Sequence, residues 1–397
     1  MNETSAGRRD FVKAAAGAAA AGCLAPLARG EERMGILKRN ITRPLAITMW
    51  DFSWLERRWP GAGYEDWDVA LDELKARGYD AVRIDAYPHL VAADAKREWE
   101  LLPCWNQQDW GSPAKNRVRV QPALNEFIAS CRDRGLLVGL STWFRQDRQD
   151  TRMKIRGPED FGGIWKKTVD GVAQAGLLDS LLYVDLCNEF PLDVWAPFLP
   201  QGTLRASPLG TRWMRDGVAI VREAFPRLDY TVSFTTEYDT WRAQDVSFLD
   251  FLELHLWMAQ HASDFYEKVG YHYERFESKG YENVVDRAEP LYRQDPAHWQ
   301  DALRRSIHGL AEWSRVSKKA LATTECWALV DYKDWPLLDW GWIQELCEVG
   351  VRTAAETGRW FAIATSNFCG PQFRGMWRDV AWHRRMTDVI HGARIDA

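Results

Sequence analysis

The sequence of 397 residues predicts a single α/β domain of the (β/α)8 barrel class, also called a TIM barrel. Short apolar runs rich in β-branched residues alternate eight times with segments whose apolar residues recur at helical spacing. The connections after the predicted strands are long, whereas those after the predicted helices are short. No linker rich in Pro, Gly or Ser interrupts residues 45–391, so we expect residues 45–397 to form one barrel domain.

Each of the eight strands is predicted from a short apolar run. The runs are LAITMW (45–50), AVRIDAY (81–87), LLVGLSTW (136–143), LLYVDLCNE (181–189), YTVSFTTE (230–237), FLELHLW (251–257), ALATTECW (320–327) and WFAIATSN (360–367). Helical spacing predicts helices over 64–78, 123–135, 165–176, 211–225, 301–316, 341–358 and 377–390. Several of these segments end at glycine, the usual left-handed helix terminator. Only the connection between the fifth and sixth strands lacks a clear helix.

The long connections span about 88–121, 144–160, 190–210 and 258–299. Active sites of (β/α)8 barrels are built from the loops that follow the strands. We therefore expect the functional residues at the carboxyl ends of the strands. The loop 258–299 is rich in Phe and Tyr, which could form an aromatic wall over the site or a separate hydrophobic cluster.

The N-terminus resembles a twin-arginine export signal. GRRDFVK (7–13) precedes the weakly apolar stretch AAAGAAAAGCLAPLA (14–28), which is too short to span a membrane. We expect a signal peptide over 1–28, cleaved near Ala28, and a lead-in segment over 29–44. The protein is thus expected in the periplasm or outside a bacterial cell. A lipid anchor at Cys23 is less favoured, because AAGC lacks the leucine usual in a lipidation motif.

Composition excludes several classes of function. The net charge is only −5 and no run of Lys or Arg indicates nucleic-acid binding. The six cysteines after Cys23 form no CxxC or Cys/His spacing, so we expect no metal and no cofactor. The 22 Trp offer flat apolar plates for the core or for the face of a sugar ring. The sequence makes no prediction of oligomeric state.

Two glutamates lie at matching strand ends. Glu189 closes the fourth strand after Asn188, and Glu325 occupies the same place on the seventh. These strands face each other across a barrel mouth, so both carboxylates can converge on one cleft, the arrangement that glycoside hydrolysis requires. Glu237, at the end of the fifth strand, is the main rival carboxylate.

With these residues, the sequence resembles the cellulase-like superfamily of retaining glycoside hydrolases, over nearly the whole chain after the predicted signal. Asn188-Glu189 matches its acid/base motif and Thr324-Glu325 its nucleophile motif. Arg83 matches an arginine that supports the nucleophile, and His255 a histidine lining the sugar site. The resemblance implies a double displacement by two glutamates on a β-linked glycan or oligosaccharide, with carbohydrate as the partner and no cofactor.

The chain departs from this pattern at several places and is therefore predicted to be a distant branch. Phe190 separates Glu189 from Pro191, and Trp257 stands where a tyrosine is common. The third strand offers no histidine. The tryptophan frequent on the eighth strand is absent, leaving Phe368 or Trp377 as substitutes.

Further candidates for sugar binding are Asn188, Asp51, Trp143 and Trp257, all at strand ends, although a structural role fits the last three equally well. A catalytically silent, cellulase-like sugar-binding protein is the alternative function. A metal-dependent hydrolase would need an H-x-H pair on the first strand, which reads TMWDFSW. A phosphate-binding barrel would need glycine-rich turns after the seventh and eighth strands.

Overall fold

The computed structural model describes residues 37–105, 109–112, 114–262, 264–271, 278–330 and 334–396. The expected signal peptide with Cys23, and the start of the lead-in segment, lie outside the described residues. The expectations about export and lipidation therefore stay predictions.

Eight parallel strands form the barrel and confirm the predicted fold class. They are β1 (Leu45–Asp51), β2 (Ala81–Asp85), β5 (Leu137–Ser141), β6 (Leu181–Asp185), β7 (Tyr230–Thr231), β8 (Phe251–Glu253), β10 (Ala320–Thr323) and β12 (Trp360–Ala364). The sheet order is β7-β6-β5-β2-β1-β12-β10-β8. A parallel bridge between Phe234 and Leu254, just beyond β7 and β8, joins the two edges.

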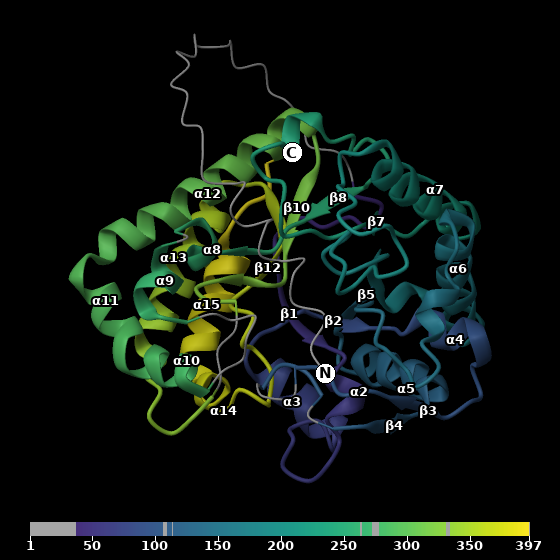
Figure 1. Cartoon of the computed structure of the whole chain (residues 1–397), viewed down its shortest axis with the longest axis horizontal. Helices are drawn as coiled ribbons and strands as arrows, with labels where there is room; N and C mark the ends of the chain where they lie inside the picture. Colours follow the sequence, from purple (N-terminus) through teal and green to yellow (C-terminus); the bar gives the residue numbers. More distant parts are fainter. Residues whose placement is uncertain are drawn as a thin grey trace.

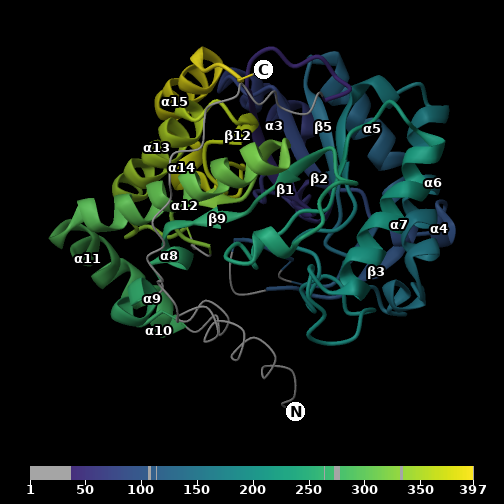
Figure 2. The ribbon, with the colours of Figure 1, turned by 90° about the horizontal axis from the view of Figure 1, so that it is seen from above.

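The seven predicted helices are all present. They are α3 (Trp67–Ala76), α5 (Val120–Asp133), α6 (Pro158–Gln174), α7 (Pro208–Ala224), α12 (Pro296–Ser317), α13 (Gly341–Glu356) and α15 (Val380–Gly392). The fifth and sixth strands are joined through only a 3-10 turn, η3 (Trp241–Ala243), as the sequence indicates. Figures 1 and 2 both show α12, α13 and α15 on one side of the strands and α5, α6 and α7 on the other.

Local sequence explains where these helices begin, end and pack. In α6, Phe161, Trp165, Val169 and Val172 recur at helical spacing and are buried against the barrel. In α7, Ser207 accepts a hydrogen bond from the backbone N–H of Gly210 and so caps the first turn. Four predicted helix terminators, Gly78, Gly135, Gly176 and Gly358, have φ between 66° and 88°, which glycine adopts without steric cost.

Additional short elements fill the connections. They are α2 (Ser53–Glu56), α4 (Pro88–Asp94), β3 (Trp99–Leu101), β4 (Asn116–Val118), η1 (Thr151–Lys154), η2 (Leu178–Ser180), β9 (Leu256–Trp257), α8 (Met258–His261), α9 (Asp264–Val269), α10 (Ser278–Asn283), η4 (Val284–Ala288), α11 (Glu289–Gln294), β11 (Cys326–Trp327) and α14 (Arg374–Trp377). Most of them follow strands, in agreement with the predicted asymmetry of the loops.

The described aromatic residues of loop 258–299 form a separate cluster. The ring of Phe265 lies 5.0 Å from that of Trp299 in α12 and 6.0 Å from that of Trp342 in α13. Tyr271 and Tyr281 are buried and pack on each other at 5.7 Å. The sequence left two roles open for this loop, an aromatic wall over the site or a separate hydrophobic cluster. These residues form the separate cluster, which packs on the outer helices.

Large side chains fill the barrel interior. The ring of Phe251 on β8 contacts Tyr183 on β6 at 5.0 Å and Phe361 on β12 at 4.9 Å. A Cβ at Gly139 on β5 would come within 2.6 Å of the Tyr183 ring, so only glycine permits this close approach. This packed layer forms a floor, and the polar residues of the strand ends lie beyond it.

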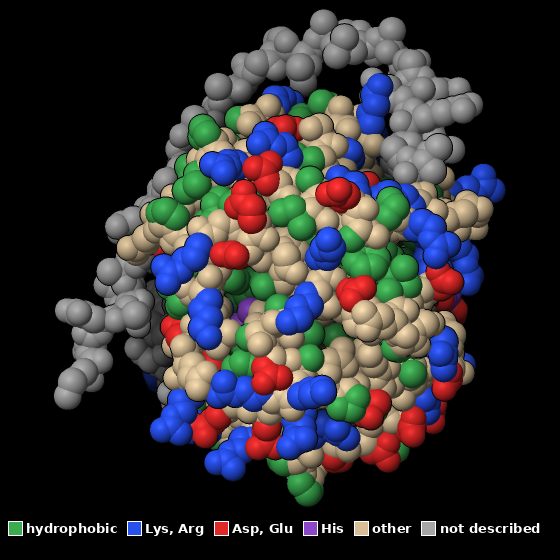
Figure 3. Space-filling model, turned by 90° about the vertical axis from the view of Figure 1, so that its right-hand side faces the viewer, with side chains coloured by type: hydrophobic (Ala, Val, Ile, Leu, Met, Phe, Trp, Pro, Cys, Tyr) green, Lys and Arg blue, Asp and Glu red, His purple; other side chains and the backbone are tan. Residues whose placement is uncertain are grey.

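Charges on the surface are mixed. On the face shown in Figure 3, Lys and Arg are interspersed with Asp and Glu and form no large patch of one sign. Among the helices in the described ranges, none has the length and apolar composition needed to cross a membrane.

Candidate active site

Four strand ends bring the predicted site residues together. Arg83 lies within β2, Glu189 follows β6, His255 follows β8 and Glu325 follows β10. The side chains of Arg83 and His255 are fully buried, while those of Glu189 and Glu325 are 9% and 12% exposed. The two carboxyl groups are thus the members of this group that reach solvent.

The two glutamates form a close pair. Single oxygen atoms of Glu189 and Glu325 and a ring nitrogen of His255 all lie within 4.8 Å of one another. His255 Nδ1 is 3.1 Å from Glu189 Oε1 and 3.5 Å from Glu325 Oε1. The convergence expected from the strand positions is therefore present.

The backbone holds Glu189 in an uncommon conformation. Its φ is 47°, in the left-handed region that few non-glycine residues adopt and that is often found at functional sites. The N–H of Glu189 donates to Ser233 Oγ at 3.1 Å, and the N–H of Phe190 donates to the Ser233 carbonyl at 3.0 Å. The extra Phe190 in this motif thus helps to anchor the loop to the segment just after β7.

Arg83 binds Glu325 directly and the neighbour of Glu189, Asn188. Its Nη1 donates to Glu325 Oε1 at 3.0 Å and to Thr324 Oγ1 at 3.2 Å. Its Nη2 donates to Asn188 Oδ1 at 2.7 Å and to Asp185 Oδ2 at 2.7 Å. The predicted support of Glu325 by Arg83 is consistent with this contact.

Two buried carboxylates, Asp185 and Glu253, were missed by the sequence analysis. Asp185 Oδ2 accepts hydrogen bonds from the hydroxyls of Ser141 and Ser233 as well as from Arg83. Glu253 Oε2 contacts His255 Nε2 at 2.9 Å. A signal was available, because each acid is two residues after an aromatic residue of the barrel interior and strand side chains alternate.

Burial and neighbouring charges shift the pKa values of Glu325 and His255. Burial raises the pKa of Glu325 to about 7, and the charge of Glu189 adds to this against the opposing effects of His255 and Arg83. Burial alone would lower the pKa of His255, but the carboxylates of Glu253 and Glu325 outweigh it and raise that pKa to about 10. At neutral pH, His255 is therefore a cation beside two coupled carboxyl groups.

The cluster of Glu189, His255 and Glu325 has the donor types of a metal site but not its electrostatics. A metal-bound histidine must be neutral, so a metal ion would have to displace a proton from His255, whose pKa in the free protein is raised to about 10. The Glu325 oxygen also receives an N–H of Arg83, so a divalent ion would meet a guanidinium cation. The residues fit an acid pair better than a metal site.

Two of the predicted sugar-binding residues offer unused donors beside this pair. Asn188 Nδ2 and Trp257 Nε1 are buried and have no hydrogen-bond partner among the described residues. The Trp257 ring packs edge-on against His255 at 6.1 Å. Such donors suit the hydroxyl groups of a bound ligand.

Trp143 and Asp51 are placed differently. Trp143 is buried and its ring lies 4.6 Å under the Arg83 guanidinium, so it packs against the site. Asp51 is buried at the end of β1, and its carboxylate accepts the N–H of Ser53. Within the described part of the chain, no hydrogen bond or ion pair joins Asp51 to either glutamate, and its role in sugar binding stays a prediction.

Two other residues complete the description of the rim. Trp195, missed by the sequence analysis, donates its Nε1–H to Glu189 Oε2 at 3.1 Å. Glu237, the rival carboxylate, accepts the backbone N–H groups of Arg205 at 2.8 Å and Ala206 at 3.4 Å. Glu237 therefore holds the loop before α7.

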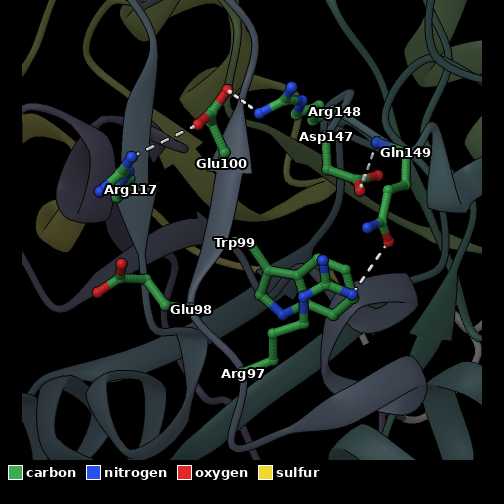
Figure 4. A pocket seen from close by; sticks show the side chains of 8 residues that line it. All are labelled: Arg97, Glu98, Trp99, Glu100, Arg117, Asp147, Arg148 and Gln149. Atoms are coloured by element: carbon green, nitrogen blue, oxygen red, sulfur yellow. Dashed lines mark hydrogen bonds and ion pairs between the residues drawn. The ribbon is translucent and has the colours of Figure 1, made fainter.

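A surface hollow beside the hairpin β3–β4 lies apart from these residues (Figure 4). It has a volume of about 370 Å³ and is lined by Arg97, Glu98, Trp99, Glu100, Arg117, Asp147, Arg148 and Gln149. Its charges neutralise one another, since Glu100 lies 3.8 Å from Arg117 and 3.9 Å from Arg148. The hollow contains none of the predicted site residues.

Comparisons with known proteins agree with this architecture. The chain is 50% identical to a candidate glycoside hydrolase from Parabacteroides distasonis, with a TM-score of 0.86 over 89% of this chain and 95% of that one. An endocellulase from Pyrococcus horikoshii, 11% identical, shares the fold with a TM-score of 0.51 over 87% and 93% of the two chains. The cellulose synthase subunit Z of Clostridioides difficile, 12% identical, shares it with a TM-score of 0.50 over 81% and 91%.

Among curated protein sequences, none matches this chain significantly. The model of the sugar-binding cellulase-like family matches residues 47–391, which include every barrel strand except the first two residues of β1. This protein belongs to the cellulase-like family.

Proposed function

We propose that this protein is a retaining glycoside hydrolase that cleaves O-glycosidic bonds of a β-linked glycan or oligosaccharide. The observation that carries the proposal is the closeness of the two glutamates, since one oxygen of Glu189 lies within 4.8 Å of one oxygen of Glu325. Carboxyl groups of retaining enzymes are about 5–5.5 Å apart, whereas inverting enzymes need about 6.5–9.5 Å for an intervening water. The geometry supports a double displacement.

In the proposed reaction, a Glu325 oxygen attacks the anomeric carbon as Glu189 gives its proton to the departing glycosidic oxygen. This step forms a glycosyl ester on Glu325 and releases the alcohol. Glu189, now a carboxylate, takes a proton from water, and the oxygen of this water attacks the face that the leaving group occupied, opposite Glu325, and displaces the Glu325 carboxylate. The roles are assigned by the strand positions and by the contact of Arg83 with Glu325.

The charges around the pair allow it to hold one proton, whereas the assignment of that proton to Glu189 rests on the strand positions and on the contact of Arg83 with Glu325. Because burial raises the pKa of Glu325 to about 7 and the charge of Glu189 adds to this effect, the pair can hold one proton at mildly acidic to neutral pH. The cations Arg83 and His255 stabilise the negative charge on whichever carboxylate carries it. Activity should therefore fall as the pH rises above about 7, because the pair then loses the proton that the leaving group needs.

The unused donors of Asn188 and Trp257 support a sugar as the ligand. A bound hydroxyl can accept from either group, and this would satisfy a buried N–H that otherwise costs about 1–3 kcal/mol. The buried indole rings around the site suit the apolar face of a pyranose ring.

Azide rescue with NMR analysis of product configuration tests the roles. Glu189→Ala removes the proton donor but leaves the nucleophile, so an activated aryl glycoside should still form the intermediate and azide should release it with retention. Glu325→Ala removes the nucleophile, so azide should attack from the opposite face and give inversion. The natural substrate should lose about 10²–10⁴-fold or more in the Glu189 variant.

Glu237→Ala provides the matched control and should keep turnover, because Glu237 contacts backbone N–H groups of a loop. Azide rescue of Glu189→Ala with inversion would exchange the two roles. A wild-type protein that binds glycans but turns over no aryl glycoside would instead be the silent sugar-binding barrel.

We further propose that the protein is exported by the twin-arginine route, on the strength of GRRDFVK and the weakly apolar stretch after it. Replacing both arginines (Arg8→Lys with Arg9→Lys) should retain the precursor in the cytoplasm of a bacterial host. Detection of the mature protein in the periplasm of that double variant would contradict this route.

A further inference from the structure

The buried carboxylate of Glu253 has no part in the two-glutamate reaction. It lies at the end of β8 and is fully buried. Its Oε1 accepts the N–H of Thr324 at 3.0 Å and the Thr324 hydroxyl at 2.6 Å. Its Oε2 is 2.9 Å from His255 Nε2 and 3.9 Å from Arg83 Nη2. Burying an ion costs several kcal/mol unless it is paired and hydrogen-bonded, so this site is built around a charge.

His255 contacts carboxylates through both ring nitrogens. Nε2 faces Glu253, whereas Nδ1 faces Glu189 at 3.1 Å and Glu325 at 3.5 Å. A neutral imidazole has one N–H and one lone pair, so one of its nitrogens would point a lone pair at a carboxylate oxygen. Only the imidazolium donates on both sides, and its Nδ1–H can reach whichever of Glu189 and Glu325 is ionised when the pair shares one proton.

We propose that Glu253 is a positioning residue that keeps His255 doubly protonated and aims its Nδ1–H into the space between Glu189 and Glu325. The kinetic consequence rests on the proposed glycoside hydrolase function, whereas the protonation state of His255 does not. A donor fixed between the two carboxylates stabilises negative charge on Glu189 after it protonates the leaving group, and on Glu325 in the free enzyme.

The groups that face His255 come from four strands. Glu189 lies beyond β6, Glu325 beyond β10 and Glu253 on β8, while Arg83 on β2 contacts Glu253 and Glu325. Beyond β7, the hydroxyl of Tyr238 donates to the backbone carbonyl of His255.

Two ion pairs in this cluster are each neutral, since each joins one cation to one carboxylate. Asp185 pairs with Arg83 at 2.7 Å, and Glu253 pairs with His255. The charge that remains to be shared therefore resides on Glu189 and Glu325. Loss of the Glu253 charge would leave His255 buried with weaker support for its proton.

NMR of the imidazole nitrogens tests the proposal in the wild-type protein without any substrate. We expect both nitrogens of His255 to carry protons at pH 8. In Glu253→Gln, the amide keeps the shape but not the charge, so His255 should be neutral at pH 8 and regain its second proton at lower pH. A neutral His255 in the wild type at pH 7 would overturn the proposal.

Kinetics give the second readout. In Glu253→Gln, kcat/KM should fall at least about tenfold at pH 8 and recover towards pH 5. The reason is that the alkaline limb of the pH profile of kcat/KM moves to lower pH by at least about one unit. Glu253→Asp restores the charge and should move that limb back towards its wild-type position. A uniform loss at every pH, with unchanged nitrogen shifts, would show that Glu253 is only structural.

Glu56→Gln is the matched control. Glu56 is also a buried glutamate paired with a cation, since it binds Arg145 at 2.9 Å, yet it has no contact with His255. This variant should lose stability but keep the position of the alkaline limb. If the wild type cleaves no glycoside while His255 titrates as expected, the proposed function fails and the positioning role of Glu253 stands.

Discussion

Two buried arginines of this barrel differ in how their charge is balanced. Arg145, after β5, meets one carboxylate: its Nε and Nη2 bind the two oxygens of Glu56 at 2.9 and 3.0 Å. Arg83 meets three, with Asp185 at 2.7 Å, Glu325 at 3.0 Å and Glu253 at 3.9 Å. With Glu189 included, four carboxyl groups surround two cations, Arg83 and His255.

This difference separates a structural ion pair from a chemically active cluster. The Arg145 pair is complete, and the remaining N–H of its Nη2 also reaches the carbonyl of Leu102 at 2.7 Å. In the Arg83 cluster, burial raises the pKa of Glu325 to about 7, and the charges of Glu189 and Glu253 add to this against those of His255 and Arg83. An incompletely neutralised buried charge is unfavourable for stability and useful for proton transfer.

The largest expected effect comes from removing each arginine. Both Arg83→Ala and Arg145→Ala leave a buried carboxylate without its partner, which costs about 3–5 kcal/mol of unfolding free energy. Only Arg83→Ala should also lower turnover per folded molecule, by about 10²-fold or more, because it removes a cation that stabilises the reacting carboxylates. Denaturant titration and active-site-normalised kinetics measure the two effects. Equal turnover losses in both variants would remove the distinction between the two clusters.

A smaller effect is expected for the pH dependence of the unfolding free energy, which reflects the proton on Glu325. The pKa of Glu325 in the folded protein is about 7, above its usual 4.5, so the folded state binds this proton more tightly than the unfolded state. The wild-type unfolding free energy should therefore fall as the pH rises from about 4.5 through 7. Glu325→Gln carries no such group and should be more stable than the wild type at pH 8, by about 2 kcal/mol, with little difference at pH 4.5.

Glu345→Gln is the control of opposite sign for that experiment. Burial alone would raise the pKa of Glu345, but hydrogen bonds from Tyr292 and Arg293 outweigh it and lower the pKa. Its stabilising contribution is present above the unfolded-state pKa and lost as the pH falls. This variant should therefore be less stable than the wild type at pH 8, and a gain there would contradict the assigned charges.

The smallest expected effect concerns the indole donor on Glu189. Trp195→Phe keeps the ring but removes the Nε1–H that binds Glu189 Oε2 at 3.1 Å. A hydrogen bond to a charged group is worth about 1.5 kcal/mol or more, so kcat should fall about tenfold. Trp165→Phe also removes a buried indole donor, but that donor binds the backbone carbonyl of Leu186. It should lower stability and leave kcat unchanged, and steady-state kinetics distinguishes the pair.

The Arg83 cluster and the Arg145 pair also differ in how far the sequence alone predicts their residues. Arg83, Glu189, His255 and Glu325 could be selected beforehand, because each lies within or just after a predicted strand and matches a family motif. The pair of Arg145 with Glu56 could not, since it joins residues 89 positions apart, one in the loop after β5 and the other at the end of the short helix α2. Trp195 escaped notice for the same reason: its loop carries no periodic pattern that predicts where its indole points.

By itself, the sequence determined the order of eight strands and seven helices, the side of the barrel with the long loops, and the strand ends that carry the two glutamates. These features follow from side-chain periodicity and loop length, which are local properties. Only the tertiary structure decided that Glu253 lies against one nitrogen of His255 while Glu189 and Glu325 share the other. Closure of the barrel sets these distances, because it brings side chains from separate strands into one desolvated volume where each charge depends on all the others.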